Sequence, residues 1–298
     1  MSTSRDSLDG TTRLASTFSI VAFDPKTKNL GVAVQSRYFS VGTAVPWAKT
    51  GVGAVATQSF VNISYGPRGL NLLKRGFKVH EVVQNLTGKD KDRDYRQLGI
   101  IDAKGNTAAY TGSKCLEWAG SRIGKNYSTQ GNILASEKVV TNMAKRFETT
   151  EGDLADRLVA ALEGGEEEGG DARGRQSAAL LVVGKRKSKG GYGDRLIDLR
   201  VEDHSDPIAE LKRLLKLHRV YSLIDEADET LTAGNPKKAI ATIEKALELN
   251  PHSDDTYVQL GMVYKKMGKK QEAEAAFKKA TGINPRMKTL IEQLVKRS

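Results

Sequence analysis

The sequence is poor in the residues that usually build metal, redox or disulfide sites. Its single cysteine, Cys115, excludes an internal disulfide and a cysteine-rich zinc site. The four histidines are His80, His204, His218 and His252, and no two of them stand at metal-ligand spacing. The glycines also lack the GxxxxGK order of a phosphate-cradling loop. We therefore expect no metal site and no cofactor.

Long apolar runs are absent as well. No window approaches the roughly eighteen consecutive apolar residues of a transmembrane helix, so we expect no membrane span. The first sixteen residues, MSTSRDSLDGTTRLAS, lack the apolar centre of a secretory signal. The expected location is therefore the cytoplasm.

The charge is positive but spread along the chain. The 47 lysines and arginines exceed the 36 aspartates and glutamates by 11. The densest basic run, KRKSK at residues 185–189, stands beside two glycines between two strand-like segments, which fits either a solvated hairpin tip or a phosphate-binding patch. No aromatic residues are interleaved with it to stack on bases. We therefore do not expect nucleic acid as a partner.

An internal repeat occupies the last third of the chain. An offset of 34 residues aligns Gly234 with Gly268 and Ala239 with Ala273, in the size pattern of tetratricopeptide repeats. We expect two such repeats followed by a capping helix (287–297) within residues 218–298, joined to the preceding domain by a helix at 207–217. Two repeats are fewer than the three or so needed for independent stability. We therefore expect them to dock onto the preceding domain or onto a second subunit as a homo-oligomer, and to bind a protein partner.

Residues 17–206 mix strand and helix patterns. The expected strands are 17–24, 30–37, 51–60, 95–102, 106–112, 127–133, 176–184 and 195–203. The expected helices are 67–88, interrupted near Gly76, then 135–148, and 153–165, which we expect its glycines to end. This order predicts two antiparallel sheets with helices outside, an αββα sandwich. The whole chain is then an α+β protein with an all-α repeat domain at its end.

Six strings in order carry a resemblance to a known family: TFSIVAFD, LGVAVQSR, VPWAKTGVGAVATQS, YGPRGL, QGNILAS and DARGRQSAALLVV. They resemble a prokaryotic family of unknown function that is placed with the N-terminal nucleophile (Ntn) hydrolases, the superfamily of proteasome β subunits and penicillin acylases. The resemblance covers about residues 17–206. It implies a four-layer αββα sandwich and the hydrolysis of an amide-type C–N bond in a small amide or peptide-like substrate.

The resemblance implies that Thr17 is the nucleophile. In the superfamily, the side chain of the first residue attacks a carbonyl and its free α-amine takes the proton. Sixteen residues precede Thr17 here, so the Ser16–Thr17 bond would have to be cut, autocatalytically or by a protease. The alternative is that Thr17 is a β-branched residue that starts an edge strand.

Further site residues follow from the same resemblance. Asp171 would orient the amine, or else cap an acidic loop. Gly131 and Asn132 would form an oxyanion hole, unless Ser136 simply caps the next helix. The other residues expected at the substrate are Thr57, Gln58 and Asn62 after the third strand, Ser36, and the arginines Arg37, Arg173 and Arg175, which would grip a carboxylate or make surface ion pairs.

Two departures from the superfamily pattern favour a second hypothesis. Gln35 stands where proteasome subunits have an aspartate, and the nearest candidate for their lysine, Lys49, looks displaced towards a turn. Cys115 is expected to be a buried thiol beside Trp118 rather than a nucleophile. The alternative function is a non-catalytic Ntn-fold scaffold that presents the tetratricopeptide surface, with residues 1–16 kept as an amino-terminal arm.

Overall fold

A computed structural model describes residues 14, 15, 17–185 and 194–297 of the chain. The chain divides into two compact units, Met1–Lys212 and Arg213–Ser298. Each unit is described by itself. Most of the basic run at 185–189 lies outside the described residues; of its members, Lys185 is exposed.

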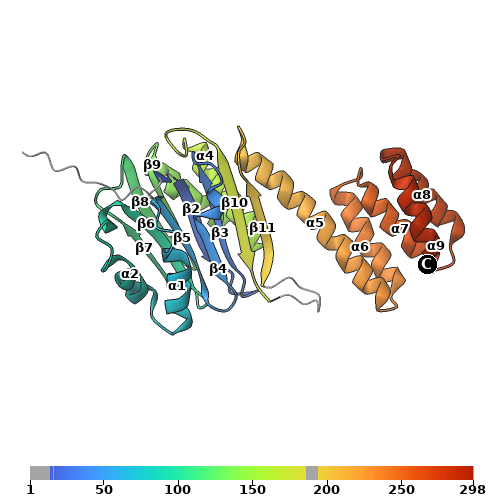
Figure 1. Cartoon of the computed structure of the whole chain (residues 1–298), viewed down its shortest axis with the longest axis horizontal. Coiled ribbons are helices and arrows are strands. Elements are labelled where there is room, and N and C mark those ends of the chain that lie inside the picture. The colour runs from blue at the N-terminus through green and yellow to red at the C-terminus, as the bar shows by residue number, and fades with distance from the viewer. Residues whose placement is uncertain (1–13, 16, 186–193, 298) are drawn as a thin grey trace, which may run out of the picture. The chain divides into compact units, whose positions relative to one another are not determined.

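The first unit contains two antiparallel sheets (Figure 1). One sheet follows the order β11 (Arg195–Val201), β10 (Ser177–Val183), β3 (Leu30–Ser36), β2 (Thr17–Phe23), β9 (Tyr127–Leu134) and β8 (Trp118–Gly124). The other follows the order β1 (Leu14–Ala15), β5 (Gly53–Phe60), β6 (Arg96–Asp102) and β7 (Thr107–Thr111), with β4 (Pro46–Lys49) also paired to β5. The described part of the chain thus confirms the predicted pair of antiparallel sheets.

The two sheets pack face to face over an apolar core. Val21 on β2 and Val32 on β3 lie in one buried cluster with Ala54 on β5 and Ile101 on β6. Because side chains alternate along a strand, the neighbouring residues on β2 and β3 point to the opposite face, towards helices. The residues that line the space between the sheets are therefore every second residue of each strand.

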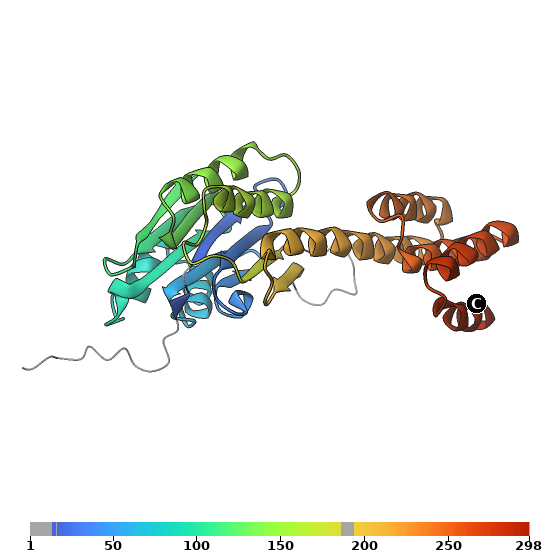
Figure 2. The same cartoon turned by 90° about the horizontal axis from the view of Figure 1, so that it is seen from above.

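Helices cover the outer faces of both sheets. The helices α1 (Tyr65–Lys74) and α2 (Val79–Thr87) pack on the β5–β6–β7 sheet through a cluster that includes Leu70, Val82 and Leu98. The helices α3 (Lys138–Thr149) and α4 (Leu154–Glu167), yellow-green in Figure 2, lie on the other sheet. Two short 3₁₀ turns, η1 (Val41–Thr43) and η2 (Arg93–Tyr95), complete the unit.

The structure corrects the expected end of one helix. We expected Gly164 and Gly165 to end the second helix of the α3–α4 pair, but α4 continues through them to Glu167. The reason is packing: a Cβ at Gly165 would lie 2.9 Å from atoms of both Met143 and Phe18. These glycines therefore let α4 approach α3 and β2 closely and do not serve as a cap. The strands β4 and β8 were not anticipated.

The second unit is all helical. It comprises most of α5 (Pro207–Thr232), then α6 (Pro236–Leu249), α7 (Asp254–Lys266), α8 (Lys270–Ile283) and α9 (Met287–Arg297). The expected joining helix at 207–217 does not end before the first repeat, since α5 runs through that boundary without a break. The repeat pattern has the expected packing, because a Cβ at Gly261 would come within 2.3 Å of the Phe277 ring. The helix α9 occupies the position predicted for the capping helix.

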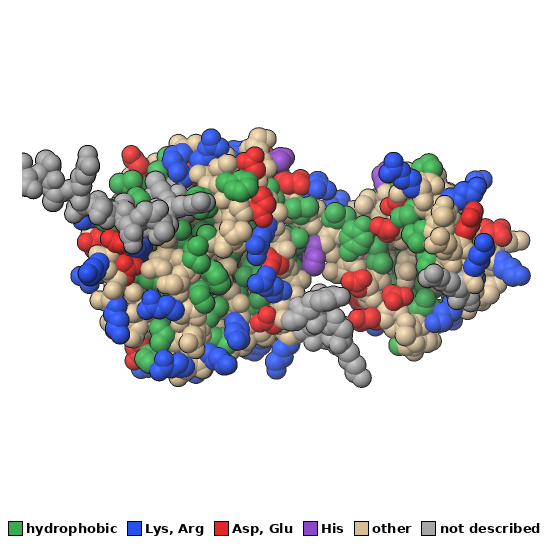
Figure 3. Space-filling view, viewed as in Figure 1, with side chains coloured by type: hydrophobic (Ala, Val, Ile, Leu, Met, Phe, Trp, Pro, Cys, Tyr) green, Lys and Arg blue, Asp and Glu red, His purple; other side chains and the backbone are tan. Residues whose placement is uncertain are grey.

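The surface carries both signs of charge. Figure 3 shows Lys and Arg side chains interspersed with Asp and Glu over the visible face of both units, with no single basic stripe there. Among the described residues, no helix is both long enough and apolar enough to cross a membrane.

Candidate active site

Thr17 opens a strand in the interior of a sheet. It is the first residue of β2, which lies between β3 and β9, and it pairs with Ser36 on one side and Asn132 on the other. The edge-strand interpretation of Thr17 is therefore wrong. The residue is fully buried, and its Oγ1 donates a hydrogen bond of 3.1 Å to Ser36 Oγ.

The space between the sheets changes character at the Thr17 end. Whereas the far end is filled by Val, Leu, Ala and Ile side chains, this end holds several fully buried polar residues. We call seven of them the interior polar cluster. Its members are Thr17, Ser19, Ser36, Gln58, Gln97, Gln130 and Asn132. Burying amides and hydroxyls is costly unless they are hydrogen-bonded. The members of the cluster therefore need hydrogen-bond partners, and they find them in one another.

Gln97, on β6, is the central residue of this cluster. Its Oε1 accepts hydrogen bonds from Gln58 Nε2 at 2.8 Å and from Asn132 Nδ2 at 2.9 Å. Its Nε2 donates to Gly131 O at 2.7 Å and to Thr111 Oγ1 at 2.9 Å. One amide side chain thus ties the two sheets together next to Asn132 and Gly131, the predicted oxyanion residues.

Gln58 connects the same network to Thr17. Its Nε2 donates to Thr17 O at 3.3 Å, and its Oε1 accepts from Ser19 Oγ at 2.6 Å. Gln130 Nε2 in turn donates to Ser19 Oγ at 2.7 Å. Sequence reasoning missed Ser19, Gln97 and Gln130, although each is a polar residue at an inward position of a buried strand.

Backbone strain marks the same place. Ser59 and Ile133, the residues directly after Gln58 and Asn132, have φ angles of 68° and 51°. Left-handed backbone at residues other than glycine, asparagine or aspartate is unfavourable and concentrates at functional sites.

Asp171 holds the end of β3 next to Ser36. Its buried carboxylate accepts hydrogen bonds from the backbone N–H of Arg37 at 2.9 Å and of Arg173 at 3.0 Å. It also pairs with the Arg173 guanidinium at 3.1 Å, and its backbone forms a bridge with Leu134 at the end of β9. Asp171 therefore fixes the strand ends that flank Thr17 on both sides.

The three predicted arginines gather around this carboxylate, and all are exposed. Arg173 is paired with Asp171, and Arg175 is paired with Glu166 at 2.5 Å. Arg37 donates from its NH1 to Arg175 O at 3.2 Å, and no described carboxylate forms an ion pair with it. Arg37 is therefore the arginine of the three whose charge is open to a ligand.

Some of the predicted residues lie elsewhere. Thr57 faces away from the interior polar cluster, and its Oγ1 donates to Asn62 O at 3.1 Å. Asn62 donates from Nδ2 to Asp90 at 3.2 Å. Lys49 is exposed and pairs with Gly53, at the opposite end of β5 from Gln58. The cluster therefore consists of neutral side chains.

A buried ion pair lies behind the end of β5. Arg96 contacts Asp90 at 3.0 Å and also donates from NH1 to Phe60 O at 2.7 Å. Burial acts to raise the pKa of Asp90, but hydrogen bonds from Arg96 and from Tyr65 outweigh it and lower this pKa to about 2. Burial, the bond to Asp90 and its charge raise the pKa of the Tyr65 hydroxyl. The pair fixes the carbonyl of the last residue of β5.

Cys115 lies close to this ion pair. Its Sγ lies 3.5 Å from Arg96 O, and burial raises the pKa of its thiol. A raised pKa disfavours the thiolate that a nucleophilic cysteine needs. Among the described residues, no group of three or more His, Cys, Asp or Glu side chains could hold a metal ion.

The segment before Thr17 crosses from one sheet to the other. Leu14 and Ala15 form β1, which pairs with Phe60 and Ser59 of β5. Two residues later, Thr17 is already part of the opposite sheet. β1 and the start of β2 therefore belong to different sheets at the end of the domain that holds the interior polar cluster.

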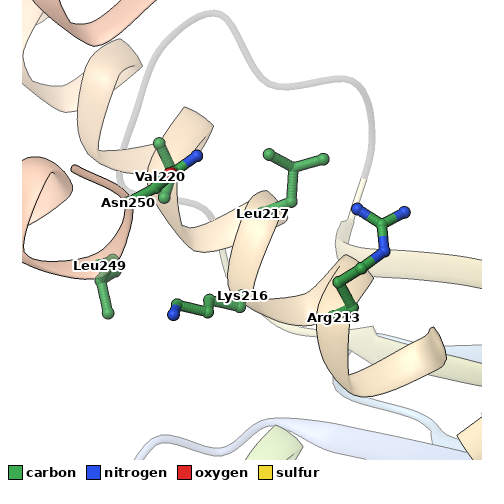
Figure 4. Close-up of a pocket in the computed structure, with 6 residues that line it drawn as sticks. All are labelled: Arg213, Lys216, Leu217, Val220, Leu249 and Asn250. Atoms are coloured by element: carbon green, nitrogen blue, oxygen red, sulfur yellow. The ribbon is translucent and has the colours of Figure 1, made fainter. Parts of the chain in front are cut away.

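A separate pocket lies in the second unit (Figure 4). It is lined from α5 and from the end of α6 by Arg213, Lys216, Leu217, Val220, Leu249 and Asn250. The lining combines two cations with apolar side chains and contains no hydroxyl, carboxylate or imidazole. This lining lacks the groups for hydrolysis.

The fold and the buried polar end define the first unit as an α+β domain of two antiparallel sheets with a candidate site at the start of a central strand. The family model described as "Family of unknown function (DUF1028)" matches residues 17–211, so the chain belongs to this family. The tetratricopeptide repeat model matches residues 226–253 and 254–287, which confirms the predicted repeats.

One solved structure extends this result. The crystal structure of protein SPO2555 from Silicibacter pomeroyi, described with the same DUF1028 family model, is 31% identical to this chain with a TM-score of 0.61. The match covers 67% of this chain and 88% of the other. No curated protein matches the chain.

Proposed function

We propose that the first unit is an Ntn-type hydrolase of amide C–N bonds, with Thr17 as its nucleophile once the chain before it is cut. The observation that carries this proposal is the position of Thr17. It begins a central strand and points into a buried polar cluster between the sheets. The match to the family model begins at the same residue, as expected if the functional domain starts there.

The chemistry needs the α-amine of Thr17. Thr17 Oγ1 attacks the substrate carbonyl carbon and its proton passes to the amine, directly or through a water. The C–N bond then breaks, the leaving amine takes that proton, and the acyl group remains on Oγ1 as an ester. Water hydrolyses the ester and restores the threonine. An α-amine suits this role because its pKa, about 7.7–8.0, is close to working pH.

The neighbouring residues have distinct proposed roles. Asn132 and the backbone beside Gly131 stabilise the oxyanion, with Asn132 held in place by Gln97. Asp171 is a positioning residue, because it anchors the Arg37 backbone and thereby keeps Ser36 beside Thr17 Oγ1. Arg37 supplies a positive charge for a substrate carboxylate. The repeats of the second unit bind a protein partner or assemble subunits.

The test compares three proteins: the full chain from Met1, the chain that starts at Thr17, and the Thr17→Ala form of the latter. In the uncut chain the amine of Thr17 is an amide nitrogen and accepts no proton. We expect only the Thr17-first protein to hydrolyse members of a panel of acyl-amides and peptides. Intact mass of the full chain reports whether the segment is removed during expression.

Asp171→Asn in the Thr17-first protein tests the positioning role. It removes the charge that holds Arg173 while keeping the size of the side chain, so kcat should fall while the fold persists. The matched control is Asp198→Asn, which removes an exposed partner of Arg195 and Arg200 on β11 and should leave kcat unchanged. Equal kcat in the two variants would rule out this role for Asp171.

A specific observation supports the second candidate, a non-catalytic scaffold. Gln35 stands where proteasome subunits have an aspartate, and it is fully buried with no hydrogen-bond partner for either amide atom in the described part of the chain. It pairs with Phe18 and Ala178 and so faces the helices, away from Thr17. Background turnover by both Thr17-first proteins across the whole panel would favour this scaffold.

A further inference from the structure

One of the two edges of β5 pairs with two short strands, β4 and β1, one after the other. β6 occupies one edge along residues Gly53–Ser59. On the other edge β4 pairs with the first half of the strand, from Gly53 to Ala56, and β1 pairs with Ser59 and Phe60. Without residues 14 and 15, the second half of this edge would be an open strand edge, which is a ready template for another extended chain.

The chain that occupies this edge has a particular chemical relation to Thr17. Leu14 and Ala15 lie on the carbonyl side of the Ser16–Thr17 bond, so they belong to the acyl part of the bond whose cleavage frees the Thr17 amine. Any later substrate must present its carbonyl to the same Thr17 oxygen. A substrate whose acyl part follows the direction that residues 14 and 15 take would run along β5.

The docking edge is rigidly built. The carbonyl of Phe60 is held by the Arg96 guanidinium, itself fixed by Asp90, and the Phe60 ring contacts Tyr95 edge to face at 5.5 Å. Ser59 keeps a left-handed backbone with φ 68°. Such strain persists only where the surroundings impose it, so the shape of the edge does not depend on residues 14 and 15 alone.

We propose that the edge of β5 at Ser59 and Phe60 is the acyl-side subsite and that it takes a peptide segment in extended form. This inference rests on the proposed function and names its substrate class. Strand addition uses backbone N–H and C=O groups at regular spacing, which a peptide has and a small acyl-amide lacks. The segment 1–16, once released, is then a product that competes with substrate for the same edge.

The binding experiment does not depend on catalysis. It uses the chain that starts at residue 17 with Thr17→Ala and a synthetic peptide of residues 9–16, DGTTRLAS, measured by calorimetry. A second peptide is N-methylated at Leu14 and Ala15, which removes the N–H donors of the paired residues. The control peptide carries the same two methyl groups at Thr11 and Thr12, outside β1. The protein is the same in all three measurements, so misfolding of a variant cannot produce a difference between the peptides.

We expect the unmodified and control peptides to bind alike and the peptide methylated at Leu14 and Ala15 to bind about tenfold more weakly or worse, as expected for the loss of one or two hydrogen bonds. Equal affinity of all three peptides, or no binding at millimolar concentration, overturns the subsite.

A kinetic experiment tests the substrate class. In the Thr17-first protein, the 9–16 peptide should raise KM for a peptide substrate without changing kcat. Hydrolysis confined to amides of short acyl groups, with no turnover of extended peptides, overturns the peptide class. If the peptide binds as expected but nothing in the panel is hydrolysed, the proposed hydrolase fails while the strand subsite stands, so the two failures are distinguishable.

Discussion

The buried carboxylate of Asp90 offers the sharpest test of how the end of β5 is held. It accepts hydrogen bonds from Arg96 Nε at 3.0 Å, Tyr65 Oη at 2.7 Å and Asn62 Nδ2 at 3.2 Å, and one from the backbone N–H of Asp92. Asp90→Asn keeps the shape but removes the charge opposite Arg96 and places an NH₂ group among donors. Leaving Arg96, whose side chain is 7% exposed, without its close partner should cost about 3 kcal/mol.

Asp92 provides a matched control on the same guanidinium. Its carboxylate lies 3.4 Å from Arg96 NH2, but its side chain is 40% exposed. Exposed ion pairs contribute about 0.2–1 kcal/mol, so Asp92→Asn should cost less than about 1 kcal/mol. The two variants remove the same charge two residues apart and differ chiefly in burial.

The assay can read the first unit alone. The chain has two tryptophans, Trp47 and Trp118, and both belong to this unit. Urea unfolding followed by tryptophan fluorescence therefore reports the sheets and not the repeats. If the unfolding free energies of the two variants differ by less than about 0.5 kcal/mol, burial is not what makes the Asp90–Arg96 pair strong, and the reasoning fails.

The same pair predicts a dependence on pH. The folded pKa of Asp90, about 2, lies below the ordinary aspartate value of 3.8. The ionised group therefore stabilises the folded state above the unfolded pKa, and this contribution is lost as pH falls from about 4 to about 2. The difference corresponds to about 2 kcal/mol. The difference in unfolding free energy between the original chain and Asp90→Asn should decrease by about that amount over this pH range. A difference that stays constant with pH would contradict the lowered pKa of Asp90.

Two further changes test the polar interior and the repeats. Gln97→Leu leaves Gln58 and Asn132 without their shared acceptor, so the tryptophan-reported unfolding free energy should fall by about 2–3 kcal/mol. A loss below about 0.5 kcal/mol would show that these bonds contribute little. Ala273→Leu adds volume at a buried position of α8 and should destabilise the repeats by about 1–3 kcal/mol in a circular-dichroism melt, with the tryptophan transition unchanged. If the circular-dichroism and tryptophan transitions both shift, the two units do not unfold independently and the prediction is contradicted.

The periodic parts of the fold could be predicted from the sequence. The β2–β3 hairpin follows from two β-rich runs around a turn, and the repeats follow from the 34-residue offset that aligns Gly234 with Gly268. The end of α4 could not be predicted in the same way. Taken alone, its glycines predict the end of a helix. In the structure, the absence of a side chain at Gly165 instead allows Phe18 to pack closely against α4. Tertiary contact decides between these two uses of glycine.

The site was predicted in outline only. Strand order and register bring Thr17, Ser36 and Asn132 together, and Gln58 faces them from the opposite sheet. Two of these residues, Thr17 and Ser36, stand at strand ends. Gln97 was missed because its contacts with Gly131 and Asn132 cross to the opposite sheet, and the relative position of two packed sheets is not encoded in any local pattern. β1 was missed because two residues are too short for an alternation to be visible.

The neutrality of the interior polar cluster has a consequence for the cutting event itself. All seven members are hydroxyl or amide side chains, none of which titrates in the physiological range. Cutting before Thr17 converts an uncharged amide nitrogen into an ammonium group inside this neutral shell. Desolvation favours the uncharged amine there, so its proton affinity falls below that of an exposed terminus. Cleavage of the Ser16–Thr17 bond would thus place one titratable group, the α-amine of Thr17, in an otherwise neutral cluster.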